Sequence, residues 1–180
     1  MKPGIIAATL ALVYSVSATS YSPPESKEVV STNGKFHLRV DAQTNIHEVS
    51  GQFGKFIPRW HFCHDVFGAD FFLSDDGETT VVVSWRYVGD KFLGEPAVVV
   101  YTRYGARRMY NYRELSKARA LKRNEGGPVG EDWRVWRDTI TTKDNKITIV
   151  VEGASPQSID LASGRLLEEP QTKSRAGRRE

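Results

Sequence analysis

The densest group of side chains that could do chemistry lies in the heptapeptide RWHFCHD, which starts at Arg59. Imidazole, thiolate and carboxylate groups all bind zinc, and a thiol beside an imidazole can act as a nucleophile. Because alternate side chains of a strand share one face, His61, Cys63 and Asp65 would lie together. His64 would lie on the opposite face. The pattern supports one hypothesis for function, a small metal- or cysteine-dependent enzyme centred on His61, Cys63 and His64.

Other features of the chain argue against catalysis or a metal in this stretch. Cys63 is the only cysteine, so the paired spacing typical of zinc sites is absent. Neighbours on one strand also rarely converge on a single ion or substrate atom. The chain has no Gly-x-Ser-x-Gly motif and no glycine-rich phosphate loop. We therefore expect a half-buried strand here and assign no catalytic residue, no metal site and no cofactor.

Charge is divided unevenly along the chain. Residues 41–95 contain nine acids and four bases, whereas residues 103–137 contain ten bases and four acids. Tyrosines and tryptophans interleave with this basic half, and such a surface suits an anionic partner. The formal net charge is only +3, so long-range steering would be weak. The residues expected to contribute most to binding are four arginines: Arg107, Arg108, Arg119 and Arg123.

The N-terminal segment has the pattern of a secretory signal peptide. Lys2 supplies a positive charge, an apolar run extends from Ile5 to Val16, and small residues follow at Ser17 and Ala18. The run is too short to cross a hydrocarbon core of about 30 Å as a helix. We predict a signal peptide over 1–18 and export to the periplasm or the extracellular space. We expect no transmembrane segment in the mature chain and no nucleic-acid partner.

The rest of the chain predicts one folded domain. Residues 19–28 are rich in proline and serine and predict a flexible linker, residues 29–167 predict a single β-rich domain, and residues 168–180 predict a disordered basic tail. Only the segment near 112–123 has helical spacing, and a Gly-Gly-Pro cluster follows it. The fold class is therefore all-β, mainly antiparallel hairpins, with one short helix. Strands are predicted over 35–41, 79–85, 97–101, 132–140, 146–151 and 155–161.

Three turns share one pattern, at Ser31–Lys35, Ser74–Glu78 and Thr142–Lys146. Each has a hydroxyl residue, a spacer, Asn or Asp, then Gly or Asn, then a charge, and each precedes a β-rich run. Asn-Gly, Asp-Gly and Asp-Asn tolerate the positive φ of a two-residue hairpin turn. Gly34 and Gly77 are 43 positions apart, which suits a four-stranded repeat, whereas Asn145 follows 68 positions later and requires an insertion.

The segments LSDDGETTVVVSW, AVVVYTRYGARRMYNY, DNKITIVVEG and SIDLASGRLL resemble the recurring units of bacterial exported β-propeller-like proteins of unknown function. The resemblance covers 71–167 and implies hairpins that pack as propeller blades. Closed propellers need about four blades, whereas this domain has room for at most three. We therefore expect an open or partial propeller or a β-sandwich, and the sequence leaves oligomerisation open.

The sequence as a whole predicts an exported, non-enzymatic interaction domain. Its basic, aromatic face would bind a protein or an anionic envelope component. The enzyme described above is the alternative hypothesis, and a purely structural role in a larger assembly is a third.

Overall fold

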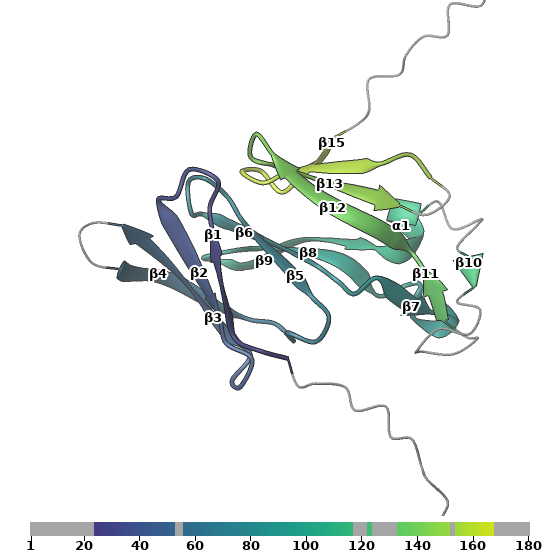
Figure 1. Cartoon of the computed structure of the whole chain (residues 1–180), viewed down its shortest axis with the longest axis horizontal. Coiled ribbons are helices and arrows are strands. Elements are labelled where there is room, and N and C mark those ends of the chain that lie inside the picture. The colour runs from purple at the N-terminus through teal and green to yellow at the C-terminus, as the bar shows by residue number, and fades with distance from the viewer. Residues whose placement is uncertain (1–23, 53–55, 117–121, 124–132, 152–153, 168–180) are drawn as a thin grey trace, which may run out of the picture.

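A computed structural model describes residues 24–52, 56–116, 122–123, 133–151 and 154–167 (Figure 1). In this part of the chain, three four-stranded antiparallel sheets follow one another, each built from strands in chain order, and only the middle sheet skips a strand, β7 (Tyr87–Gly89). A single short α-helix accompanies them. The predicted fold class, mainly antiparallel β-structure with one short helix, is confirmed. The sheets are open and do not close into a barrel.

The first two sheets consist of strands of four to eight residues. The first sheet consists of β1 (Lys27–Val30), β2 (Phe36–Val40), β3 (Ile46–Gln52) and β4 (Phe56–Cys63). The second, middle sheet consists of β5 (Asp70–Leu73), β6 (Thr79–Val83), β8 (Pro96–Thr102) and β9 (Gly105–Asn111).

The third sheet follows a set of short elements. It consists of β12 (Arg137–Lys143), β13 (Lys146–Val151), β14 (Gln157–Asp160) and β15 (Leu166–Leu167). A separate three-stranded sheet contains β7 (Tyr87–Gly89), β11 (Trp133–Val135) and β10 (Lys122–Arg123), and the 3-10 helix η1 (Asp90–Phe92) follows β7. The predicted strand over 132–140 is therefore two strands, because the chain leaves one sheet at Trp136 and enters another.

The helix α1 (Tyr112–Ser116) begins where the sequence predicts it. Asn111 caps it, since its side-chain oxygen accepts a hydrogen bond from the N–H of Glu114 at 2.7 Å, and the N–H of Asn111 donates to the carboxylate of Glu114 at 2.9 Å. The prediction that the helix continues to residue 123 is wrong at its end. Lys122 and Arg123 pair with β11 instead, and residues 117–121 lie outside the described part.

The three patterned turns occupy equivalent places in the three sheets. Each connects the first strand of its sheet to the second. Gly34, Gly77, Asp144 and Asn145 all have positive φ, as the turn chemistry requires. The longer second spacing arises because β7, η1, α1, β10 and β11 are inserted before the third sheet begins.

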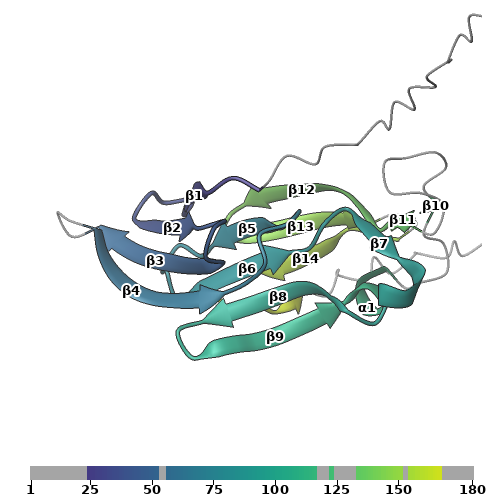
Figure 2. The same cartoon turned by 90° about the horizontal axis from the view of Figure 1, so that it is seen from below.

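The middle sheet is covered on both faces, which is visible in the two views of the fold (Figures 1 and 2). Its strand β6 is buried along its whole length, as its valine-rich sequence predicts. Val82 packs in the cluster shared with the first sheet, together with Leu38 and Val49. Val81 and Val83 pack in the cluster shared with the third sheet. The domain thus has two cores, one on each side of the middle sheet.

The first strands of the three sheets lie next to one another. Lys27 of β1 donates a hydrogen bond to the carbonyl of Ala69, immediately before β5, at 3.2 Å. Arg137 of β12 is buried and forms an ion pair with Asp70 of β5 at 2.7 Å. These contacts fix the order of the three sheets around a common edge.

The outer faces of the first and third sheets, which point away from the middle sheet, carry mainly polar side chains. On the first sheet, a cross-strand row consists of Glu28, Arg39, Glu48 and His61. On the third sheet, the corresponding row begins with Thr141, Thr148 and Ser158 and ends at an apolar residue, Leu167. Stacked repeats end in this way where no further repeat covers them. Three sheets can therefore form a stable open array without closing.

Among the described residues, no helix is long and apolar enough to cross a membrane.

Candidate anion-binding pocket

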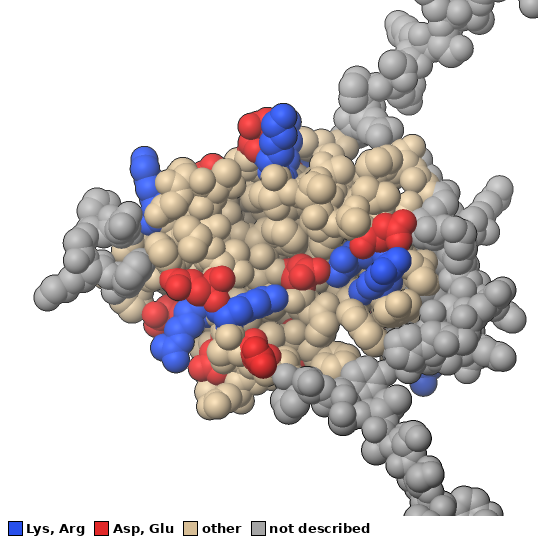
Figure 3. Space-filling view, in the orientation of Figure 1, with Lys and Arg blue, Asp and Glu red and all other residues tan. Residues whose placement is uncertain are grey.

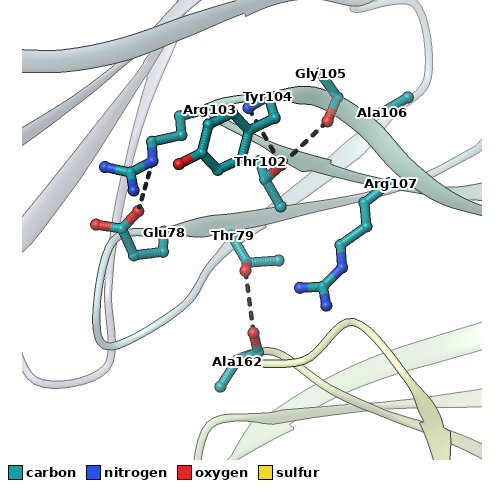
Figure 4. Close-up of a pocket in the computed structure, with 9 residues that line it drawn as sticks. All are labelled: Glu78, Thr79, Thr102, Arg103, Tyr104, Gly105, Ala106, Arg107 and Ala162. Carbon is teal, nitrogen blue, oxygen red and sulfur yellow. Dashed lines mark hydrogen bonds and ion pairs between the residues drawn. The ribbon is translucent and has the colours of Figure 1, made fainter.

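A hollow of about 470 Å³ lies at the end of the middle sheet where β8 turns into β9 (Figure 4). Glu78 and Thr79, at the start of β6, form one wall. The β8–β9 hairpin forms a second wall, and Ala162 in the turn after β14 lies below it. The hydroxyl of Thr79 donates a hydrogen bond to the carbonyl of Ala162 at 3.1 Å, which joins the second and third sheets at this point.

A β-bulge in β9 directs Arg107 into this hollow. Val100 of β8 pairs with Arg108 and the next residue, Tyr101, pairs with Ala106, so Arg107 is the extra residue on its strand. A bulge interrupts the alternation of side chains and re-aims the residue at its centre. Figure 4 shows the guanidinium group of Arg107 extended from the hairpin toward Ala162.

Positive charge exceeds negative charge around the hollow. The carboxylate of Glu78 is shared by two arginines: it forms a close ion pair with Arg59, and Arg103 Nε lies 3.9 Å from its other oxygen. Arg107 forms no hydrogen bond or ion pair within the described part of the chain. Two guanidinium groups therefore share the carboxylate of Glu78, and Arg107 adds a further positive charge to the lining of the same hollow, so an additional anion would be favoured here.

An exposed aromatic ring stands beside these charges. Tyr104 is 83% exposed, and the guanidinium carbon of Arg103 lies 4.8 Å from the centre of its ring. The N–H of Tyr104 donates to the hydroxyl of Thr102 at 3.3 Å, which holds the turn. Guanidinium groups bind carboxylate, phosphate and sulfate in a planar, two-pronged geometry. The hollow can therefore bind an anionic group and place an apolar part of the same ligand against Tyr104.

The four predicted arginines do not all lie at this hollow. Arg107 does, whereas Arg108 follows it on β9, where its Nε atom is buried without a hydrogen-bond partner among the described residues. Arg123 belongs to β10, in the separate three-stranded sheet, and Arg119 lies outside the described part. Arg103, which lines the hollow, is not among the arginines that the sequence predicts to bind. The combination of a base, an aromatic residue and a glycine turn in Thr102–Gly105 was the signal that could have identified it.

The acidic and basic halves of the sequence mix in space. Figure 3 shows acidic and basic side chains side by side across one face rather than as two separate regions. Asp70 pairs with Arg137, and Glu78 lies near Arg103, so acids of one half meet bases of the other. Part of the uneven charge is therefore neutralised within the fold, and Arg107, in the lining of the hollow, has no such partner among the described residues.

The histidine-rich stretch has the alternation that the sequence predicts. Trp60 and Phe62 are buried, and His61 and Cys63 are exposed. His64 Nδ1 lies 2.9 Å from the hydroxyl of Tyr101. No group of three or more metal-binding side chains is close enough to hold an ion within the described residues. His61 and Cys63 thus face outward, while His64 contacts Tyr101 of the middle sheet.

His47 is buried in the first core and is held as one neutral tautomer. Its Nδ1 accepts the N–H of Asp41 at 3.2 Å, so the proton lies on Nε2, which donates to the carbonyl of His64 at 2.9 Å. Its ring packs edge-on against Phe62 and Phe71. Burial lowers the pKa of both His47 and His64. Through its two ring nitrogens, His47 therefore links the turn that follows β2 to the segment that follows β4.

No protein-family model matches the chain, and a search of curated proteins finds no similar sequence. The geometry of the hollow is therefore the basis on which function is inferred.

Proposed function

We propose that the protein is a non-enzymatic interaction domain that binds an anionic group of a protein or an envelope component in the hollow beneath the β8–β9 hairpin. The observation that carries this proposal is that Arg103 and Arg107 both line the hollow: Arg103 shares Glu78 with Arg59, whereas Arg107 has no hydrogen-bond or ion-pair partner among the described residues. A carboxylate, phosphate or sulfate placed between Arg103 and Arg107 would neutralise both. Tyr104 would contact the rest of the ligand.

The exposure of the hollow sets the expected strength of binding. Arg103 is about half exposed, so its attraction to an anion is screened by water and salt. A single small anion should therefore bind weakly, and its affinity should fall as ionic strength rises. A polymer or protein surface that presents several anions would bind more tightly because its contacts add within one complex.

The class of partner follows from the N-terminal pattern. A signal peptide over 1–18 directs the chain out of the cytoplasm, where nucleic acid is not the expected anion. Proteins and anionic envelope polymers are the partners available after export. This part of the proposal is tested separately, by N-terminal sequencing of the protein recovered from the periplasm or the medium.

Titration of the full chain with sodium phosphate, followed by NMR chemical shifts at constant ionic strength, tests the pocket. The signals of Arg103, Tyr104 and Arg107 should move together and saturate. Replacing both arginines (R103Q, R107Q) should weaken phosphate binding by at least about fivefold, which corresponds to about 1 kcal/mol. Arg39→Gln is the matched control, because Arg39 is exposed on the outer face of the first sheet. An equal loss in this control would contradict the proposal.

The alternative hypothesis, an enzyme centred on His61, Cys63 and His64, stays a prediction. None of these three residues lines the hollow that contains Arg103 and Arg107. Substitutions at the two places therefore test the two hypotheses independently. If the interaction domain is correct, His61→Ala and Cys63→Ser will leave phosphate binding unchanged. Both substitutions change exposed residues and should not disturb either core.

A further inference from the structure

A second hollow, of about 320 Å³, lies at the opposite end of the middle sheet. It lies beyond the last residue of β6 and before the first residue of β8. Its charged lining residues are Asp65 and Glu95, and no Lys or Arg among the described residues lines it. Its walls are mainly aromatic, formed by Phe67, Trp85, Tyr87, Phe92 and Tyr112. We call this hollow the aromatic cleft.

Three rings of the cleft pack against one another, and a glycine lies against the central one. Trp85 lies edge-on to Phe67, with ring centres 5.6 Å apart, and edge-on to Tyr87, with centres 5.2 Å apart. Gly68 has a φ of +64°, and a Cβ atom there would overlap the indole of Trp85. Only glycine lets the indole lie this close to the backbone. The cleft is therefore a preformed wall of aromatic rings.

The electrostatics of the cleft favour a cation. The faces of aromatic rings carry partial negative charge and attract ammonium groups, and the carboxylates of Asp65 and Glu95 add to this. His64, which also lines the cleft, adds no positive charge at neutral pH because burial lowers its pKa. The hollow under the β8–β9 hairpin has the opposite charge, so the two ends of the middle sheet select different ligands.

The chain's own cations already use the same rings. Lys91 Nζ lies 5.0 Å from the centre of the Phe92 ring, and the guanidinium of Arg86 lies 6.0 Å from that of Tyr87. Neither residue lines the cleft. Arg86 is also paired with Asp138 at 2.8 Å, so its charge is neutralised nearby. These two side chains lie over rings of the cleft, and neither forms an ion pair with Asp65 or Glu95 among the described residues.

We propose that the aromatic cleft binds an alkylated ammonium group. Methyl groups on the nitrogen would pack against Trp85 and Tyr87, while the positive charge would lie near Asp65 and Glu95. A neutral ligand of the same shape would keep the packing and lose the electrostatic attraction. This proposal does not depend on the anion-binding function of the other hollow.

Calorimetric titration of the full chain with choline and with 3,3-dimethylbutan-1-ol tests this directly. The second compound has carbon in place of the charged nitrogen and is otherwise the same shape. Choline should bind saturably, with Kd in the millimolar range or below, and the neutral compound should bind at least about tenfold more weakly. Equal binding of the two would show an apolar hollow without cation selectivity and would overturn the proposal. So would the absence of saturable choline binding.

Variants that keep every ring locate the site. Replacing Asp65 and Glu95 by their amides (D65N, E95Q) should weaken choline binding at least about fivefold, or about 1 kcal/mol. Asparagine keeps an oxygen for the N–H of Phe67, which Asp65 accepts at 2.9 Å, so this turn should still form. The matched control removes two carboxylates from the outer face of the first sheet (E28Q, E48Q) and should leave binding unchanged. Unaltered binding in D65N, E95Q would overturn the proposal.

Discussion

Asn33 and Asp75 join the first turn of the first sheet to the first turn of the middle sheet through two hydrogen bonds. The N–H of Asn33 donates to Oδ1 of Asp75 at 2.9 Å, and Nδ2 of Asn33 donates to the backbone oxygen of Asp75 at 2.7 Å. The N–H of Asp75 in turn donates to Oδ1 of Asn145, in the matching turn of the third sheet, at 3.0 Å. The residues that make the hairpins thus also tie the three sheets together.

Asp75→Ala should lower the free energy of unfolding by about 1 kcal/mol, because it removes the acceptor of the Asn33 N–H. Asp75→Asn keeps an oxygen at this position and should lose less than half as much. Urea denaturation of the two variants and the parent protein measures both values. Equal losses in the two variants would show that the side-chain oxygen contributes nothing to the joint.

A pair of glycines separates the cost of backbone strain from the cost of a collision. Gly34 and Gly77 have φ values of +70° and +68°, so alanine should cost about 1–2 kcal/mol at either position. A Cβ atom at Gly34 meets nothing within 4 Å, whereas one at Gly77 would overlap the ring of Phe36. Gly77→Ala should therefore lose about 1–3 kcal/mol more than Gly34→Ala in thermal or urea unfolding. Similar losses would mean that Phe36 moves aside freely.

Two adjacent threonines in β6 should respond in opposite ways to valine. The hydroxyl of Thr79 donates a hydrogen bond to the backbone carbonyl of Ala162. Thr79→Val should therefore lower the free energy of unfolding by about 1 kcal/mol. Thr80 is fully buried, and its hydroxyl has no hydrogen-bond partner among the described residues. Thr80→Val should therefore leave stability unchanged or raise it, by up to about 1 kcal/mol. Differential scanning calorimetry of the two variants checks the sign of each change, and a loss in Thr80→Val would contradict the prediction.

Stability should fall on the acid side of neutrality because of His47 and His64. Burial lowers the pKa of both imidazoles below 6.5 in the folded protein, so the unfolded chain takes up protons first. Above about pH 7 their contribution is constant, and it is lost progressively as pH falls from 6.5 toward the folded-state pKa values.

The His47→Gln variant should show a shallower decline between pH 7 and pH 5 than the parent protein. Protonation of His47 at Nδ1 would remove its acceptor for the N–H of Asp41, and glutamine has no such titration. His61→Gln, which changes an exposed imidazole, is the control and should keep the slope of the parent protein. Urea denaturation at several pH values measures the three slopes, and an unchanged slope in His47→Gln would refute the assignment.

Local chemistry was sufficient to predict the class of fold and most of its elements. The positive φ at Gly34, Gly77 and Asn145 depends on the turn residues themselves, and the burial of β6 depends on its unbroken run of Val and Thr. The start of α1 follows from Asn111 and Glu114, which lie three positions apart and cap each other. Its end could not be predicted from helical spacing, because Lys122 and Arg123 pair with a strand that comes later in the chain.

The two candidate sites required the tertiary structure. The sequence places Arg107 in a basic segment, but the β-bulge that turns it toward Ala162 depends on its register with β8. The aromatic cleft combines Asp65, Trp85 and Glu95, which come from three separate connections and meet only because β6 ends at the edge of the sheet where β5 and β8 begin. Turns, strand periodicity and burial are set by neighbours in the chain, so the sequence by itself determined them. Register and the order of sheets are set by contacts between distant residues, such as Arg137 with Asp70, so only the folded structure decided which side chains share a site.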